Sequence, residues 1–230
     1  MDVNEPQSVR ERYARREAHD MRYSLLTPAA LLALQERQRA MMALFARLGH
    51  TELSTLRLLE VGCGTGSNLI ECLHMGFMPE NLVGIELLPE RFDVAKARLP
   101  ASVRLLQGDA VALAPAVGSV DIVLQATVFS SLLDDGFQQR LADVMWHAIK
   151  PGGGVLWYDF TVNNPRNRDV RGVPMRRVRE LFPQGRIESR RITLAPPIAR
   201  AVSRLHPALY TLFNTLPALR THVLCWIAKD

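Results

Sequence analysis

Cysteine is scarce in this sequence, and long apolar runs are missing. The three cysteines, Cys63, Cys72 and Cys225, are odd in number and far apart in a chain of 230 residues, so neither a disulfide framework nor a zinc-ligand pattern is present. No apolar run approaches the ~20 residues that span a bilayer, and residues 1–7 are polar and acidic, unlike a signal peptide. We therefore expect a soluble protein of the reducing cytoplasm, with one large α/β domain or at most two small ones.

Lysine is scarce as well, and the positive charge is unevenly distributed. Only three of the 28 basic residues are lysines, namely Lys96, Lys150 and Lys229. Residues 56–150 carry 7 basic and 11 acidic side chains, whereas residues 151–230 carry 13 basic and 5 acidic ones. The arginine-rich C-terminal third can attract a phosphate, a nucleic acid or a lipid headgroup, although a solvated face is the simpler interpretation.

Strand and helix patterns alternate from residue 56 onward. Apolar residues at helical spacing predict a long amphipathic helix over residues 29–48, and a charged helical pattern precedes it over residues 8–22. The predicted strands cover 56–61, 82–86, 103–107, 120–126, 155–160, 186–194 and 221–228. The later helices are predicted over residues 67–75, 134–149 and 174–181, and another helix is predicted to begin at Pro89. Residues 151–154 are predicted to form a turn. Such alternation predicts a mainly parallel, doubly wound sheet. We divide the chain into a helical cap, residues 1–50, and an α/β domain, residues 51–230.

A glycine-rich loop between a strand and a helix carries the clearest chemical signal. Residues 58–67 read LLEVGCGTGS, with Gly62, Gly64 and Gly66 at alternate positions after Glu60. Glycines let the backbone turn tightly and approach a ligand, and the following helix N-terminus can receive a negative group. A dinucleotide fingerprint, G-x-G-x-x-G, would need glycine where Ser67 stands.

The observed pattern, E-x-G-x-G-x-G, resembles the first motif of class I S-adenosylmethionine-dependent methyltransferases, and the resemblance covers roughly residues 56–160. It implies a Rossmann-like sheet of seven strands whose last strand is antiparallel. It also implies S-adenosylmethionine as cofactor and S-adenosylhomocysteine as product. In the family the glycine loop holds the methionine end of the cofactor, and Glu60 orients the loop or accepts a bond from the cofactor amine.

Two further carboxylates match the family pattern. The resemblance implies that Glu86, at the end of the second strand, accepts both ribose hydroxyls, since a carboxylate accepts at two oxygens. Asp109, after the third strand, would accept from the adenine amino group. The implied cofactor-binding residues are Glu60, Gly62, Cys63, Gly64, Gly66, Asn68, Glu86, Leu87, Asp109, Ala110, Gln125 and Ala126. Each carboxylate alone has a structural alternative, such as a helix cap for Asp109, but their order favours cofactor binding.

The sequence after the fourth strand departs from several subclasses of the family. Residues 127–131 read TVFSS, without the histidine that many small-molecule members carry and without the N-P-P-Y of enzymes that methylate adenine or glutamine amides. Cys63 lies in the glycine loop, which does not suit the nucleophile of cytosine C5 enzymes, and a lysine-based tetrad is not evident. Because methyl transfer depends mainly on proximity and alignment, the lack of an obvious base does not argue against an enzyme.

Two later segments are predicted to form the acceptor side. The polar loop after the fifth strand supplies Asp159, the leading base candidate or else a salt-bridge partner of Arg166 or Arg171. The candidate substrate-binding residues are Tyr158, Asn163, Asn164, Arg166 and Arg171. Near the N-terminus, Tyr13, Arg22 and Tyr23 are candidates for contacts with the methionine carboxylate or the substrate, or for packing.

The connection between the last two strands, about residues 195–218, far exceeds the ~2–5 residues of a usual hairpin loop. It mixes apolar residues with Arg200 and Arg204, and we predict a helical lid over the active site. His206 is a second base candidate, or else a cap or packing residue, because Pro207 constrains the backbone there.

These segments favour a sugar or glycan precursor, phosphorylated or lipid-linked, as the acceptor of an O-methyltransferase. The loop and the insertion also resemble, more loosely, methyltransferases of bacterial polysaccharide pathways. One alternative is an N- or O-methyltransferase of another small metabolite. Another is a non-catalytic, cofactor-binding protein that presents arginines to nucleic acid or membrane, although the sequence shows no RNA-binding pattern. No metal site is predicted. We expect a cytoplasmic protein. Peripheral contact with the inner face of the membrane and formation of a homodimer are both compatible with the sequence.

Overall fold

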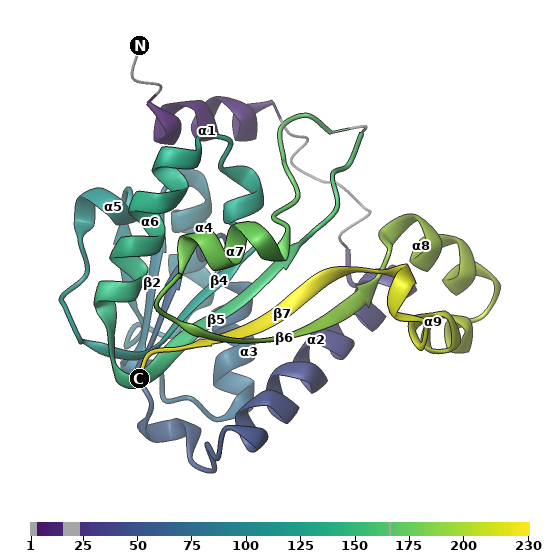
Figure 1. Cartoon of the computed structure of the whole chain (residues 1–230), viewed down its shortest axis with the longest axis horizontal. Coiled ribbons are helices and arrows are strands. Elements are labelled where there is room, and N and C mark those ends of the chain that lie inside the picture. The colour runs from purple at the N-terminus through teal and green to yellow at the C-terminus, as the bar shows by residue number, and fades with distance from the viewer. Residues whose placement is uncertain (1–3, 16–23, 166) are drawn as a thin grey trace.

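The computed structural model describes residues 4–15, 24–165 and 167–230, and Figure 1 shows how the elements are arranged. The strands are β1 (Leu58–Val61), β2 (Leu82–Glu86), β3 (Arg104–Gln107), β4 (Val120–Ala126), β5 (Ile149–Phe160), β6 (Arg186–Leu194) and β7 (Arg220–Ala228). The helices are α1 (Glu5–Ala14), α2 (Pro28–Arg47), α3 (Ser67–Met75), α4 (Pro89–Arg98), α5 (Ala110–Leu113), α6 (Asp135–Ala148), α7 (Met175–Leu181), α8 (Pro196–Leu205) and α9 (Pro207–Asn214).

The seven strands form one sheet in the order β3-β2-β1-β4-β5-β7-β6. Neighbouring strands from β3 to β5 are parallel, whereas β7 is antiparallel to both β5 and β6. This confirms the predicted doubly wound sheet with an antiparallel last strand. The order of the strands reverses between β1 and β4, and open α/β sheets bind their ligands at the carboxyl ends of strands at such a switch point.

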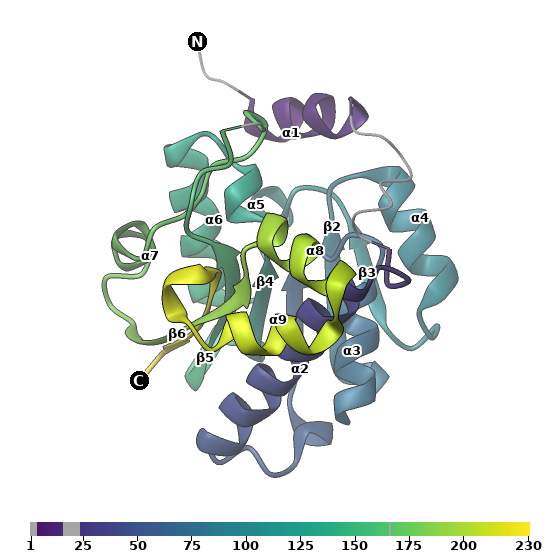
Figure 2. The same cartoon turned by 90° about the vertical axis from the view of Figure 1, so that its right-hand side faces the viewer.

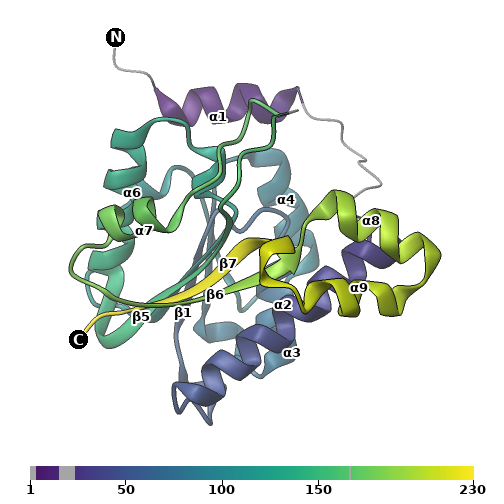
Figure 3. The same cartoon turned by 45° about the vertical axis from the view of Figure 1, so that its right-hand side comes forward.

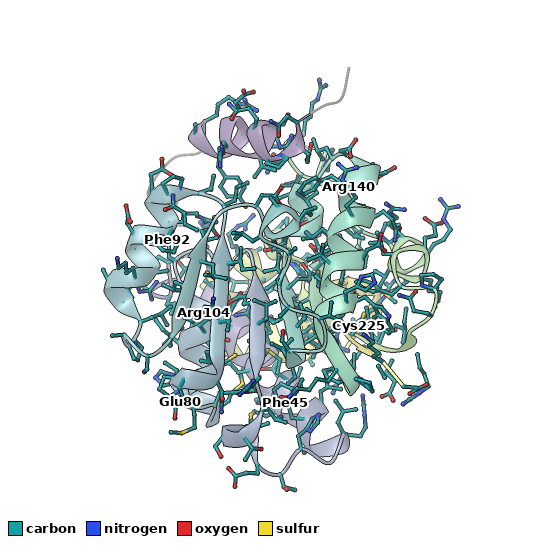
Figure 4. All side chains as sticks on the ribbon, turned by 90° about the vertical axis from the view of Figure 1, so that its left-hand side faces the viewer. Phe45, Glu80, Phe92, Arg104, Arg140 and Cys225 are labelled. Carbon is teal, nitrogen blue, oxygen red and sulfur yellow. The ribbon has the colours of Figure 1, made fainter. Side chains whose placement is uncertain are left out.

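Helices cover both faces of the sheet and enclose two cores. On one face, Phe45 of α2 and Leu69 of α3 belong to the same buried cluster. On the other face, Met145 of α6 and Trp157 of β5 pack with Cys225 of β7. Figure 4 labels Phe45 and Cys225, one from each core. The sheet is therefore buried on both sides, which explains why its central strands are continuous apolar runs.

The helices at the N-terminus lie in two different places. Helix α1 lies above the carboxyl edge of the central strands (Figure 1). Helix α2 instead packs along a sheet face, and its first half contacts the connection between β6 and β7. The predicted helix over 8–22 begins earlier and ends at Ala14, while residues 16–23 lie outside the described residues.

The segment 151–154, predicted as a turn, belongs to β5. That strand begins at Ile149, and its pairing with β4 shifts register between Val120 and Ile122. A Cβ atom at Gly153 would overlap the carbonyl oxygen of Asp121, so glycine is needed where β5 passes the irregularity. Within the described residues, no helix has the length and apolar character needed to cross a bilayer.

Candidate functional site

The glycine loop after β1 adopts a backbone that favours glycine. Gly62, Gly64 and Gly66 have φ values of +67°, +58° and +80°. A Cβ atom at Gly62 would lie 2.6 Å from Cγ2 of Val128, and one at Gly66 would lie 2.8 Å from Cδ1 of Leu99. Positive φ strains L-residues, and these neighbours also leave no room for a side chain. The sequence pattern therefore reflects a real conformational requirement of this loop.

The Glu86 carboxylate holds the glycine loop from the end of the neighbouring strand. Its Oε2 accepts from the Gly64 amide at 2.7 Å, and its Oε1 accepts from the Leu88 amide at 2.9 Å. The side chain is buried at the carboxyl end of β2. A carboxylate offers about four lone-pair sites, so two backbone donors leave capacity for two more.

A cleft opens at this edge of the sheet, with about 740 Å³ of space free of protein atoms when the solvent at its mouth is included. Its polar lining includes Glu86, Asp109 and Thr127. The predicted cofactor residues that line it are Gly62, Glu86, Leu87, Asp109, Ala110 and Ala126.

Helix α1 forms one wall of this cleft through Pro6, Val9 and Tyr13. The Tyr13 hydroxyl lies 3.3 Å from Ser131 Oγ, across from the segment that follows β4. The guanidinium of Arg91, in the first turn of α4, lies 4.8 Å from the centre of the Tyr13 ring. Arg91 was not among the predicted site residues, although its position soon after Glu86 in the sequence was an available signal.

Asp109 has both of the roles considered from the sequence. It caps the short helix α5, where its Oδ1 accepts from the Val111 amide at 2.9 Å. The same residue lines the cleft beside Ala110. The cap fixes the carboxylate in place, so the structural role and a binding role are compatible.

Glu60 lies behind the cleft rather than in its lining. The side chain is fully buried, its Oε1 accepts from Asn68 Nδ2 at 2.5 Å, and its Oε2 has no hydrogen-bond partner among the described residues. Burial raises the pKa of Glu60 to about 8, an effect that the Asn68 hydrogen bond and the nearby Arg37 charge oppose. An unpartnered buried carboxylate oxygen is costly, and the raised pKa of Glu60 reflects that cost.

Arg37 of α2 contacts the start of α3, including Asn68, which is the hydrogen-bond partner of Glu60. It donates to Asn68 Oδ1 at 2.8 Å and to Glu71 Oε1 at 2.7 Å. Its guanidinium also lies 5.2 Å from the centre of the Tyr158 ring. This buried charge network fixes the start of α3 relative to α2, and it was not predicted because its members come from three separate segments.

Two predicted cofactor residues support the loops without lining the cleft. Gln125 is buried, with its Oε1 accepting from the Val128 amide at 3.2 Å and its Nε2 donating to the Tyr158 carbonyl at 3.4 Å. Cys63 is buried against Gly84, where a Cβ atom would lie 2.8 Å from its sulfur. Burial raises the pKa of the Cys63 thiol, so it is a packing residue.

Asp159, the leading base candidate, is buried beside the segment that follows β4. Its side chain is fully buried on the far side of the segment after β4, and it does not line the cleft. Its Oδ2 accepts from the Ser130 amide at 3.1 Å and its Oδ1 from the Phe160 amide at 2.9 Å. Burial raises the pKa of Asp159 to about 7, against the opposing effect of these hydrogen bonds. Arg171 pairs with Asp135 instead of Asp159, and Arg166 lies outside the described residues.

His206, the second base candidate, likewise does not line the described cleft. It is exposed between α8 and α9, and its Nδ1 accepts from the Ala208 amide at 3.1 Å as the N-cap of α9. The predicted helical insertion is present as α8 and α9, but these helices do not line the described cleft. They pack on the N-terminal half of α2 (Figures 2 and 3).

The predicted substrate residues are dispersed rather than gathered. Tyr158 is buried on the opposite sheet face, with its hydroxyl 2.9 Å from Thr193 Oγ1. Asn163 accepts from the Gly172 amide at 2.8 Å, and Asn164 lies in the same loop. Arg171 and these asparagines do not belong to the lining of the described cleft. Arg22 and Tyr23 also lie outside the described residues.

Thr127 is a cleft residue that the sequence did not single out. It follows β4 with a φ of +58°, in the left-handed region that strains a β-branched residue. Its amide donates to the Tyr158 carbonyl at 2.8 Å, and its carbonyl accepts from the hydroxyls of Ser130 and Ser131. The described residues include no cluster of His, Cys, Asp or Glu that could hold a metal ion.

The comparison with known families matches residues 58–153 to a family described as a methyltransferase domain. Phthiotriol/phenolphthiotriol dimycocerosates methyltransferase 1 of Mycobacterium ulcerans is 33% identical over 137 residues, which cover 56% of this chain and 48% of that protein. A tRNA N(3)-cytidine methyltransferase of Mus musculus is 28% identical over 131 residues, 50% of this chain and 33% of that protein. The chain thus spans a third to a half of these relatives.

Among solved structures, phosphoethanolamine N-methyltransferase 2 of Haemonchus contortus, in complex with S-adenosyl-L-methionine, is similar to this chain with a TM-score of 0.62. The sequences are 16% identical, and the match covers 96% of this chain and 60% of that chain. At this identity the likeness is one of fold.

Proposed function

We propose that this chain is a class I S-adenosylmethionine-dependent methyltransferase, which transfers a methyl group from S-adenosylmethionine to a small-molecule acceptor. The observation that carries this proposal is the convergence of Gly62, Glu86 and Asp109 on one cleft at the switch point of the sheet. The bound cofactor supplies a methyl carbon attached to positively charged sulfur.

The residues around the cleft suit such a cofactor. Glu86 retains acceptor capacity for the two ribose hydroxyls, and Asp109 can accept from the adenine amino group. Gly62 and Gly64 let the backbone approach the methionine end of the cofactor, and Glu60 lies buried behind this loop. Helix α1 closes one side and limits the access of water.

For the acceptor, we propose a hydroxyl of a sugar or of a lipid-linked saccharide precursor. The support is the lipid named as substrate of the mycobacterial relative. Neither Asp159 nor His206 lines the described cleft, so the side chains of the cleft would act by aligning the acceptor. Alignment of a bound nucleophile can lower the barrier by ~7–11 kcal/mol.

The alternative acceptor is an amine of another small metabolite. One observation favours it: the described lining holds no histidine or lysine and no carboxylate other than Glu86 and Asp109, which we assign to the cofactor. An amine that is neutral at working pH needs no base, whereas a sugar hydroxyl holds its proton tightly.

Methyl transfer from isotopically labelled S-adenosylmethionine would test the proposal with panels of nucleotide sugars, lipid-linked saccharides and small amines. We expect label in at least one panel, and label in a saccharide would support the O-methylation hypothesis. Label confined to amines would overturn the saccharide assignment. Cofactor binding without transfer to any panel would favour the non-catalytic alternative, in which the protein presents an arginine surface to a partner.

A further inference from the structure

The α8–α9 hairpin, residues 196–214, carries an apolar surface that the fold leaves uncovered. Its inner side packs on α2 through Ala199, Val202 and Tyr210, and the Tyr210 hydroxyl donates to Glu36 Oε2 at 2.8 Å. These contacts fix the hairpin on the body of the protein, at the side seen in Figures 2 and 3. The side opposite Tyr210 is therefore presented to the surroundings in a defined orientation.

That outer side is apolar and uncharged. Leu205, Leu212 and Leu216 are 80%, 60% and 54% exposed, and Phe213 is also exposed. Residues 205–219 contain no Asp, Glu, Lys or Arg. A solvated helix normally carries charges on its outer face, so this concentration of exposed leucines marks an interaction surface.

The charged side chains of α8 and of the second half of β6 are all arginines. Arg200 and Arg204 lie on α8, and Arg190 and Arg191 are exposed on β6. None of these four arginines forms an ion pair within the described part of the chain. Residues 189–229 contain no acidic residue at all. A partner surface that complements this region is therefore anionic as well as apolar.

We propose that the outer face of the α8–α9 hairpin docks on the surface of an anionic lipid bilayer. Leu205, Leu212, Phe213 and Leu216 enter the boundary between headgroups and acyl chains, and the arginines contact the anionic headgroups. Interfacial helices combine an apolar face with Lys or Arg in this way, and the attraction of basic residues falls off within a Debye length.

Docking would orient the cleft toward the membrane surface. Because β6 is parallel to β5, the hairpin leaves the sheet at the same edge as the glycine loop after β1. Under the proposed function, this places the carboxyl edge near a lipid-linked acceptor. The docking itself does not depend on which acceptor is methylated.

Sedimentation with sucrose-loaded vesicles tests the docking. The vesicles contain phosphatidylcholine alone, or phosphatidylcholine and phosphatidylglycerol at about 7:3 as an anionic surface. We expect the full chain to sediment with the anionic vesicles only, and more weakly as salt is raised. Leu212→Glu should lower the apparent affinity about tenfold or more, and Arg200→Gln with Arg204→Gln should also lower it. The matched control is Val117→Glu, which adds the same charge at a 77% exposed apolar residue outside the hairpin.

Several outcomes would overturn the docking proposal. One is a wild-type chain that does not sediment with anionic vesicles, and another is an equal loss in Val117→Glu. A third is a dimer in sedimentation equilibrium that Leu212→Glu converts to monomer without any vesicle binding, which would assign the face to a second copy. If Leu212→Glu fails to fold, Leu216→Gln provides the same comparison. S-adenosylhomocysteine binding, measured separately by calorimetry, would reveal failure of the proposed function while leaving the vesicle result intact.

Discussion

The guanidinium of Arg12 donates to the backbone carbonyl of Ser131 at 2.9 Å and thereby fastens α1 to the segment that follows β4. The two residues are 119 positions apart in the sequence. Arg12 also pairs with Glu5 at 2.6 Å, and Glu5 in turn accepts from the Leu133 amide at 2.7 Å. The wall that α1 contributes to the cleft is therefore held by buried polar contacts as well as by packing.

Substitution of Arg12 by alanine should loosen this wall. It would leave the buried carboxylate of Glu5 without its cation, and breaking such a pair typically costs ~3–5 kcal/mol. We expect a lower free energy of unfolding in urea and weaker binding of S-adenosylhomocysteine. Arg10→Ala, at an exposed position of the same helix, is the control and should change neither quantity. Equal effects of the two substitutions would show that α1 is not fastened through Arg12.

Glu60 predicts a specific pH dependence of stability. Its pKa is raised in the folded protein from 4.5 to about 8, so the folded state holds a proton that the unfolded state releases. The resulting stabilisation is complete below pH 4.5 and is lost as the pH rises through about 8. Within that window the Glu60 contribution lowers the free energy of unfolding by up to about 1.4 kcal/mol per pH unit. Urea unfolding of Glu60→Gln should lack this contribution, and identical pH slopes for the two proteins would contradict it.

Gly62 should not tolerate a side chain. Gly62→Ala combines a φ of +67° with a clash against Val128, and we expect a loss of about 1–3 kcal/mol of stability together with weaker cofactor binding. Gly118→Ala is a matched control, because Gly118 has a φ of +58° and open space where its Cβ would lie. Thermal unfolding of the two variants separates backbone strain from the clash, and equal losses would argue against the clash.

His206 should be dispensable for chemistry. His206→Ala removes the N-cap of α9 and should lower the free energy of unfolding. We expect normal turnover at temperatures where the variant is folded, with an unchanged pH profile of kcat/KM. His206→Asn restores a capping side chain and should recover the lost stability. A large loss of kcat in both variants would restore His206 as a catalytic residue.

Local patterns predicted the parts of this molecule that depend on local constraints. The strand limits of β2, β4 and β6 agree with the predictions because each is a bounded apolar or alternating run, and the glycine loop is recognisable because its backbone needs positive φ. The side-chain direction of Asp159 could not be judged in the same way. In β5, the side chains of Tyr158 and Asp159 point to opposite faces of the sheet. Whether either side chain reaches the cleft depends on the path of the segment after β4, which local sequence patterns do not specify.

Contacts between distant segments were the other limit. The Arg12–Ser131 bond and the network from Arg37 to Glu60 join residues that no spacing rule connects. The insertion was correctly predicted to be helical, but its packing on α2 depends on Ala29 and Tyr210 meeting in three dimensions. Its expected role as a lid over the cleft remains a prediction, which deletion of residues 198–216 would test through methyl transfer and cofactor binding.

The most direct test of the proposed cofactor site is calorimetric titration of S-adenosylhomocysteine into the wild-type chain and into Glu86→Gln and Asp109→Ala. We predict one site in the wild type and an affinity at least about tenfold lower in each variant, which corresponds to ~1.4 kcal/mol or more. Glu90→Gln, at an exposed carboxylate of α4, should bind like the wild type. Undiminished affinity in both Glu86→Gln and Asp109→Ala would contradict the assignment of this cleft to the cofactor.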